Sequence, residues 1–134
     1  MDKKTSCSSV SIREIDDISI PDEIAESLCS CGGLEGLIAN LPPDILLVKM
    51  RGWYKACADP ARLKILFMLR IQPLCVCVIK GVVGMADSKL SYHLSILKKN
   101  GLIEGEQQGN YIVYRITPVA RIFLNDEMKR SGFP

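Results

Sequence analysis

Cysteine is the residue type in this chain whose number and spacing most directly suggest chemistry. Four of the cysteines form two Cys-x-Cys pairs, and the full set is Cys7, Cys29, Cys31, Cys57, Cys75 and Cys77. Soft thiolate sulfur selects thiophilic ions such as Cd(II), Pb(II), Zn(II), As(III) and Sb(III). Paired thiols also oxidise reversibly to disulfides. The pairs therefore predict a site for a thiophilic metal or metalloid, or a thiol redox switch.

The compartment of the protein determines whether its cysteines stay reduced and available for these roles or form structural disulfides. The charged residues near the N-terminus are not followed by an apolar run, so we expect no signal peptide. No apolar stretch approaches the length of a membrane span, so we expect no membrane partner. Both observations favour the cytoplasm, where thiols stay reduced. A reduced cysteine can still be a small core residue, and this is our prediction for Cys57, which stands between two alanines.

Cys75 and Cys77 follow Pro73 at the start of a predicted helix over residues 74–83. Side chains two positions apart diverge in the middle of a helix, but two sulfurs can converge where the helix begins. A helix N-terminus also lowers the pKa of a thiol. Two thiolates leave the site incomplete, because As(III) takes three ligands and Cd(II) takes four. Candidates for the missing ligands are Cys29, Cys31 and Cys7.

The elements that must position these groups divide the chain into an N-terminal extension, 1–42, and a core domain, 43–134. In the extension we expect a short helix from Pro21 to about Leu28 and a second apolar piece over 34–41. In the core, helices are predicted over 43–58, 61–71, 74–83 and 89–100, with Asp59 capping the second and Asp87 or Ser88 the fourth. A hairpin over 102–107 and 111–116 and a last helix after Thr117-Pro118 complete the order. This order predicts a mainly α fold with a β-hairpin wing, a winged helix-turn-helix.

The helix over 89–100 is the predicted reader of DNA. Leu90, Leu94 and Leu97 form one apolar stripe that fastens it to the core. The formal net charge is only +2, so binding requires a local surface and not a basic tail. The residues expected to contact base edges or phosphates are Ser88, Lys89, Ser91, Tyr92, His93 and Lys98 of this helix, and Gln108, Asn110 and Arg115 of the hairpin. Such residues also occur on the solvent-exposed face of any small helical domain. The order of the helices and strands is what favours DNA binding here.

Three segments resemble the ArsR/SmtB family of metal-responsive repressors: residues 58–66, the Leu-Cys-Val-Cys of 74–77, and residues 88–97 with the Asn-Gly-Leu-Ile that follows at 100–103. The resemblance covers roughly residues 43–125. It implies a homodimer that binds palindromic double-stranded operator DNA and releases it when a metal or metalloid binds. It also implies pairing through the first and last core helices, with contacts from Ile45, Leu46, Trp53, Val119, Ile122 and Phe123.

The resemblance further implies how the thiolate site is completed. In cadmium- and lead-sensing members, cysteines of an N-terminal arm join the Cys-Val-Cys pair across the dimer. Carried over, the site is Cys29, Cys31, Cys75 and Cys77, with Cys7 as an alternative ligand. The chain departs from the family at Val78, where members usually have an acidic residue. Its last helix contains no histidine, so we predict no second, zinc-type site.

Other functional classes fit less well. A thiol redox-sensing regulator of the same fold stays open, as does a winged-helix partner module that has lost sensing. An enzyme is not expected, because the chain lacks a Cys-x-x-Cys motif, a Gly-rich phosphate loop and a nucleophile–His–acid set. No organic cofactor is expected. Which ion acts as inducer is left open among Cd, Pb, Zn, As and Sb.

Overall fold

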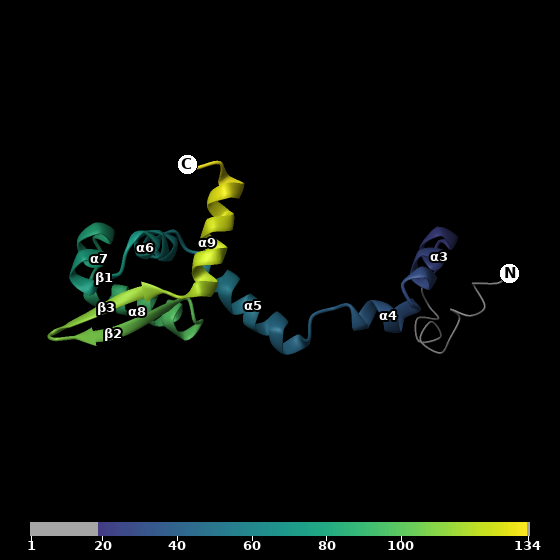
Figure 1. Ribbon diagram of the computed structural model, residues 1–134, viewed down its shortest axis with the longest axis horizontal. Coiled ribbons are helices and arrows are strands. Elements are labelled where there is room, and N and C mark those ends of the chain that lie inside the picture. The colour runs from purple at the N-terminus through teal and green to yellow at the C-terminus, as the bar shows by residue number, and fades with distance from the viewer. Residues whose placement is uncertain (1–18, 134) are drawn as a thin grey trace. The chain divides into compact units, whose positions relative to one another are not determined.

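The computed structural model describes residues 19–133 (Figure 1). The chain divides into two compact units between Asp44 and Ile45, two residues from the boundary predicted after residue 42. Each unit is described by itself. Within the described residues, no helix is long and apolar enough to cross a membrane.

In the first unit, two short helices follow one another. Helix α3 spans Asp22–Ser30 and helix α4 spans Gly33–Ala39. Two acidic residues occupy the first turn of α3, where they complement the helix dipole, and the predicted helix start is confirmed. Gly32 and Gly33 separate the helices with φ values of +95° and +72°, a left-handed conformation that glycine adopts without a steric cost.

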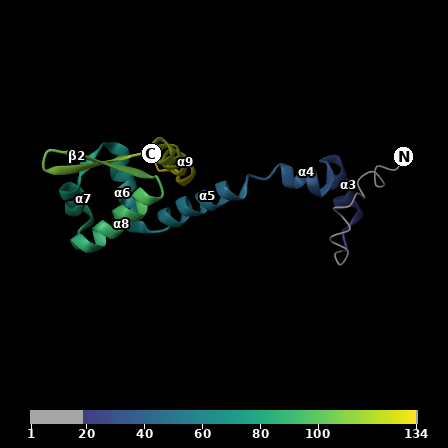
Figure 2. The same cartoon turned by 90° about the horizontal axis from the view of Figure 1, so that it is seen from below.

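The second unit has the predicted order of elements, and the prediction of a mainly α fold with a hairpin wing is confirmed. Its helices and strands are α5 (Asp44–Cys57), α6 (Pro60–Ile71), β1 (Leu74–Cys75), α7 (Val76–Val83), α8 (Asp87–Lys99), β2 (Ile103–Gln108), β3 (Tyr111–Ile116) and α9 (Pro118–Ser131). The tip of the β2–β3 hairpin projects beyond the helices in both ribbon views (Figures 1 and 2).

The hairpin is part of a three-stranded antiparallel sheet in the order β1-β3-β2. Leu74 lies opposite Tyr114 and Cys75 opposite Val113, so β1 pairs with the inner strand of the wing. The prediction of a helix beginning at Leu74 is therefore wrong for its first two residues, and α7 begins at Val76. The reason is tertiary: hydrogen bonds to β3 outcompete the helical preference of this short apolar run.

The core of this unit is built from one side of each helix and the base of the sheet. Its fully buried large side chains are Ile65, Leu66, Leu69, Ile79, Leu90, Leu97, Leu102, Ile103 and Leu124. The predicted stripe of α8 is confirmed, because Leu90, Leu94 and Leu97 are all buried. Burial of this stripe fixes which side of α8 faces outward.

Side-chain caps confirm two predicted helix starts and correct a third. Asp59 Oδ1 accepts from the backbone N–H groups of Ala61 (2.8 Å) and Arg62 (3.2 Å) at the start of α6. Thr117 caps α9 in the same way. Neither Asp87 nor Ser88 caps α8, because the capping position is Ala86 and Asp87 lies inside the first turn. Asp87 instead forms an ion pair with Lys80 of α7 at 2.6 Å.

Candidate DNA interface and thiolate site

The outward face of α8 carries most of the residues predicted to contact DNA. Ser88, Lys89, Ser91 and Tyr92 are exposed on the first two turns, and Lys98 is exposed on the last. The hydroxyl and ammonium groups here can donate to phosphates, and the hydroxyl groups can also accept from base edges. The structure thus leaves one side of α8 polar and accessible, as a recognition helix requires.

His93 does not belong to this face. Its side chain is only 5% exposed, and its Nδ1 lies 3.1 Å from a terminal guanidinium nitrogen of Arg62 in α6. His93, which we expected at the edge of the DNA-contacting face with either a DNA contact or a core-edge role, is therefore buried beside that face. It stands three positions after Leu90 and four before Leu97, so it falls on the same side of the helix as the leucine stripe.

The wing offers a polar tip. Gln108 and Asn110 are exposed on either side of Gly109, whose φ of +60° closes the two-residue turn. Arg115 is exposed in β3, and its guanidinium forms an ion pair with Glu106 of β2 at 2.9 Å. A guanidinium has five donors, so this ion pair leaves Arg115 able to donate to other groups.

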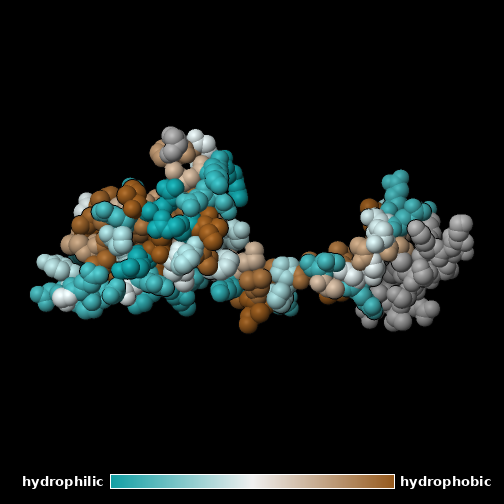
Figure 3. Space-filling view, in the orientation of Figure 1, coloured by the Kyte–Doolittle hydropathy of each residue, from teal (hydrophilic) through white to brown (hydrophobic). Residues whose placement is uncertain are grey.

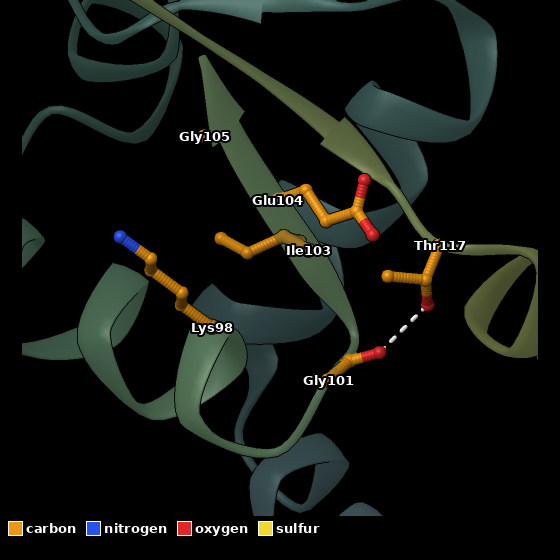
Figure 4. Close-up of a pocket in the computed structure, with 6 residues that line it drawn as sticks. All are labelled: Lys98, Gly101, Ile103, Glu104, Gly105 and Thr117. Atoms are coloured by element: carbon orange, nitrogen blue, oxygen red, sulfur yellow. Dashed lines mark hydrogen bonds between the residues drawn. The ribbon is translucent and has the colours of Figure 1, made fainter.

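A hollow of about 530 Å³ lies where the wing leaves the body of the domain (Figure 4). Lys98 and Glu104 stand on its walls, and Thr117 Oγ1 donates to the Gly101 carbonyl at 2.7 Å at its base. The sequence did not single out this place. The bond ties the start of α9 to the loop between α8 and β2, so α8 and the hairpin share one anchoring point.

The two sulfurs of Cys75 and Cys77 lie 2.6 Å apart at the start of α7, and both thiols are free. Cys75 is half-buried and is the residue that precedes the helix, whereas Cys77 is exposed in its first turn. The change from strand to helix at this point turns the two side chains toward each other. The convergence expected at a helix start is therefore present, although its cause includes the short strand β1.

The two thiols influence each other's ionisation. The pKa of the Cys75 thiol is lowered, chiefly because the Cys77 thiol donates to it and further because the backbone N–H of Val78 is close. The pKa of Cys77 is raised, chiefly because it is this donor. The pair therefore retains one proton between the two sulfurs when the first ionises. A thiolate with a neighbouring thiol is a suitable first ligand for a soft ion.

The remaining cysteines have different settings. Cys31 is exposed and Cys29 is half-buried in the first unit, while Cys57 is buried in the core as predicted. Burial raises the pKa of the Cys57 thiol, which favours an inert neutral group. Cys7 lies outside the described residues. Among residues 19–133, no three His, Cys, Asp or Glu side chains are grouped so that they could hold one ion.

The residues expected at a dimer interface lie on α5 and α9. Ile45 is 82% exposed and Ile122 is 65% exposed, with Leu46 and Val119 also exposed. Figure 3 shows apolar atoms on the surface of the first part of α5, where Leu47 and Val48 are exposed as well. Trp53 and Phe123 are instead half-buried against the core. Together these helices present apolar surface that no part of the second unit covers.

Arg62 contacts α8 from the neighbouring helix α6, and the sequence analysis did not single it out. It donates to the Ala56 carbonyl at 2.6 Å in addition to contacting His93, and it thereby joins α5, α6 and α8. The sequence shows that Arg62 stands three residues after the capping Asp59. It does not show that His93 of α8 is the partner of Arg62, because the two residues are 31 positions apart.

Comparisons with known proteins agree with this arrangement. The profile of a family described as "Bacterial regulatory protein, arsR family" matches residues 59–104. The arsenical resistance operon repressor of Bacillus subtilis (strain 168) is 40% identical over 83 residues, which cover 61% of this chain and 71% of that protein. The cadmium resistance transcriptional regulatory protein CadC of Listeria innocua is 35% identical over 66 residues, 48% of this chain and 56% of that protein. With several other relatives the match spans only 56% to 63% of their length.

Solved structures show the same fold. The homodimeric winged helix-turn-helix DNA-binding domain Mb0332 of Mycobacterium bovis, a possible ArsR-family regulator, is 31% identical with a TM-score of 0.62. The superposition covers 69% of this chain and 90% of that domain. On the sequence match to the Bacillus subtilis repressor and on this shared fold, the chain belongs to the ArsR family of bacterial regulatory proteins.

Proposed function

We propose that this protein is a transcriptional repressor that binds double-stranded operator DNA as a homodimer and releases it when a thiophilic metal or metalloid binds its cysteine thiolates. The observation that carries the proposal is the pair of sulfurs 2.6 Å apart at the N-terminus of α7, the helix immediately before the reader helix α8. The protein acts by binding and is not an enzyme.

DNA binding is supported by the polar face of α8. Ser88, Lys89, Ser91 and Tyr92 are exposed together while the leucines behind them are buried. In winged helix-turn-helix domains the second helix of the motif enters the major groove, and contacts to phosphates fix its register. Lys98, Gln108, Asn110 and Arg115 are the further candidates for contacts with the DNA backbone.

Dimerisation is supported by the uncovered apolar surface of α5 and α9. Ile45, Leu46, Val119 and Ile122 supply exposed aliphatic side chains, and Trp53 and Phe123 stand behind them. Burying such surface in a partner favours association. A dimer would present two reader helices to successive turns of a palindromic operator, which multiplies affinity. The related Mycobacterium bovis domain is described as homodimeric.

The sensing site would be completed by further thiolates. Cys75 and Cys77 supply two soft, adjacent donors, which fits Cd(II), Pb(II), Zn(II), As(III) or Sb(III) in ligand type. Three or four ligands are needed, and the extension provides Cys29, Cys31 and Cys7. Named relatives act in arsenical resistance and in cadmium resistance, which supports both kinds of inducer.

The coupling between the two sites would pass through the elements that carry the cysteines. Cys77 lies in α7, which is joined to α8 by the Lys80–Asp87 ion pair as well as by the chain. Cys75 lies in β1, which pairs with the inner strand of the wing. Suppose that the ion binds more tightly to an arrangement of these elements that does not fit DNA. The protein's affinity for DNA then falls by the ratio of the ion's affinities for the two arrangements. A difference of about 3 kcal/mol changes the operator affinity by a factor of about 150.

The test follows release of a labelled promoter fragment from upstream of the protein's own gene by fluorescence anisotropy. Reduced protein is titrated onto the DNA, and Cd(II), Pb(II), Zn(II) or As(III) is then added while sulfur-to-metal absorbance is recorded. We expect one soft ion to release the DNA from wild-type protein but not from Cys75→Ser/Cys77→Ser. Cys57→Ala is the matched control, because it removes a thiol buried away from the pair, and it should respond like wild type.

A thiol redox regulator is the second candidate, since sulfurs this close can also form a disulfide. Two thiols would transfer two electrons and two protons to an oxidant such as diamide. Release by diamide alone would favour this candidate. Retention of DNA under every ion and oxidant would make the cysteines structural, and absence of DNA binding would refute the repressor.

A further inference from the structure

Arg62 occupies a junction between three helices. Its Nε donates to the Ala56 carbonyl at 2.6 Å, and one terminal nitrogen donates to the Lys55 carbonyl at 3.4 Å. Its other terminal nitrogen lies 3.1 Å from Nδ1 of His93. One side chain of α6 therefore contacts both the C-terminal end of α5 and the middle of α8.

The local electrostatics hold the guanidinium at this junction. Arg62 lies in the first turn of α6, where the helix dipole alone disfavours a cation. Two features offset this. The carbonyls of Ala56 and Lys55 lie at the C-terminal end of α5, which carries partial negative charge, and both accept from the guanidinium. Asp59, whose carboxylate caps α6, accepts from the Arg62 backbone N–H at 3.2 Å. Backbone and side chain of Arg62 are thus both fixed.

The contact with His93 determines the state of the imidazole ring. A guanidinium has only donors, so Nδ1 must accept and the ring proton must be on Nε2. With its side chain 5% exposed, His93 has little access to water as a replacement partner. Loss of the bond would leave a buried acceptor unsatisfied, which is costly enough to drive a repositioning of the helix that carries it.

A second contact that positions α8, this time with α5, lies two turns further along the helix. A side-chain carbon added at Gly52 of α5 would collide with the side chain of Asn100, the residue that follows the last residue of α8. His93 and Asn100 are seven positions apart, about two helical turns. A close approach at Asn100 and a hydrogen bond at His93 together fix the rotation of α8 about its axis relative to α5.

We propose that Arg62 is a positioning residue for DNA recognition: through Nδ1 of His93 it sets the rotation of the reader helix α8. The inference rests on the proposed function, in which α8 reads DNA. A side-chain tip about 6 Å from a helix axis moves about 2 Å when the helix rotates by 20°. That displacement exceeds what a hydrogen bond to a base edge tolerates.

The first test uses the fact that His93 is the only histidine of the chain. A ¹⁵N-detected imidazole spectrum therefore contains one ring. We expect the Nε2–H tautomer in the free protein, with Nδ1 unprotonated, and a mixture of tautomers in Arg62→Gln. An Nδ1–H tautomer in the wild-type protein would overturn the proposal, whether or not any variant folds.

The second test compares two substitutions that differ in where they place an acceptor. The Oδ1 atom of asparagine lies close to the position of the histidine Nδ1, whereas the Oε1 atom of glutamine lies close to that of Nε2. We expect His93→Asn to bind the promoter fragment within threefold of wild type, and His93→Gln and Arg62→Lys each to bind at least tenfold more weakly. Arg51→Lys, at an exposed position of α5, controls for the arginine change.

The outcomes separate this inference from the proposed function. Equal affinities for His93→Asn and His93→Gln, or wild-type affinity for Arg62→Lys, would overturn the positioning role while DNA binding itself stood. A wild-type protein that binds no DNA would refute the proposed function, and with it the positioning role that depends on it. In that case the tautomer experiment would still establish whether Arg62 holds His93.

Discussion

Replacing Gly52 by alanine should destabilise the protein although alanine favours helices. In an open helical position the change gains about 1 kcal/mol of stability. At Gly52 the new methyl group collides with the Asn100 side chain, whose Nδ2 donates to the Ile96 carbonyl at 2.8 Å. Displacing Asn100 costs that hydrogen bond, about 1 kcal/mol, and overpacking adds roughly 1–3 kcal/mol. The net change should be a loss of about 1–3 kcal/mol.

Gly81 provides the matched control. It also lies inside a helix, α7, but a side-chain carbon built there meets nothing within 4 Å. Gly81→Ala should therefore gain about 1 kcal/mol, which separates the two variants by about 2–4 kcal/mol. Thermal unfolding followed by circular dichroism should show midpoints roughly 8–16 °C apart. Both must be measured at one protein concentration, because the stability of the proposed dimer would depend on it. Equal stabilisation by both substitutions would refute the close packing of α5 against α8.

Three further predictions concern the core, the wing anchor and pH. Leu97→Ala should lower the free energy of unfolding by about 2–5 kcal/mol in denaturant titrations, because the side chain is fully buried; a loss below 1 kcal/mol would contradict its place in the core. Thr117→Val should cost about 1–2 kcal/mol and Thr117→Ser much less, because only serine keeps the hydroxyl that caps α9 and donates to the Gly101 carbonyl. The pKa of the Asp59 carboxyl is held below its ordinary value of 3.8, chiefly because the Arg62 backbone N–H donates to it. Its contribution is therefore present above that value and lost as pH falls through the folded-state pKa, so acid unfolding below about pH 4 should be less steep for Asp59→Asn, which keeps a cap without a charge. Parallel acid curves would contradict this.

The parts of the fold that the sequence predicted are those governed by local patterns. The leucine spacing of α8, the caps Asp59 and Thr117 and the turn at Gly109 each depend on residues within a few positions. Strand β1 was missed because only its pairing with β3, about 40 positions away, makes Leu74–Cys75 extended. Non-local pairing leaves no signal in a two-residue segment.

In the candidate site, too, the features that depend on local sequence could be predicted and those that depend on distant residues could not. The outward residues of α8 and the convergence of Cys75 with Cys77 could be inferred from helical geometry. His93 was expected only at the edge of the DNA-contacting face, and its spacing from Leu90 and Leu97 agrees with its burial. Its partner Arg62 comes from another helix, and a contact of that kind is visible only in three dimensions.

Strand β2 has one further consequence, for solubility. It is one of the two outer strands of the sheet, so its far edge presents unpaired backbone groups that could recruit a strand from another molecule. Its sequence after Ile103 is Glu-Gly-Glu-Gln-Gln, and all five of these residues are exposed. A second copy docking in antiparallel fashion would bring Glu104 and Glu106 near like charges, which opposes pairing. The same acidic edge that adds negative charge to the wing thus protects a projecting hairpin from edge-to-edge aggregation.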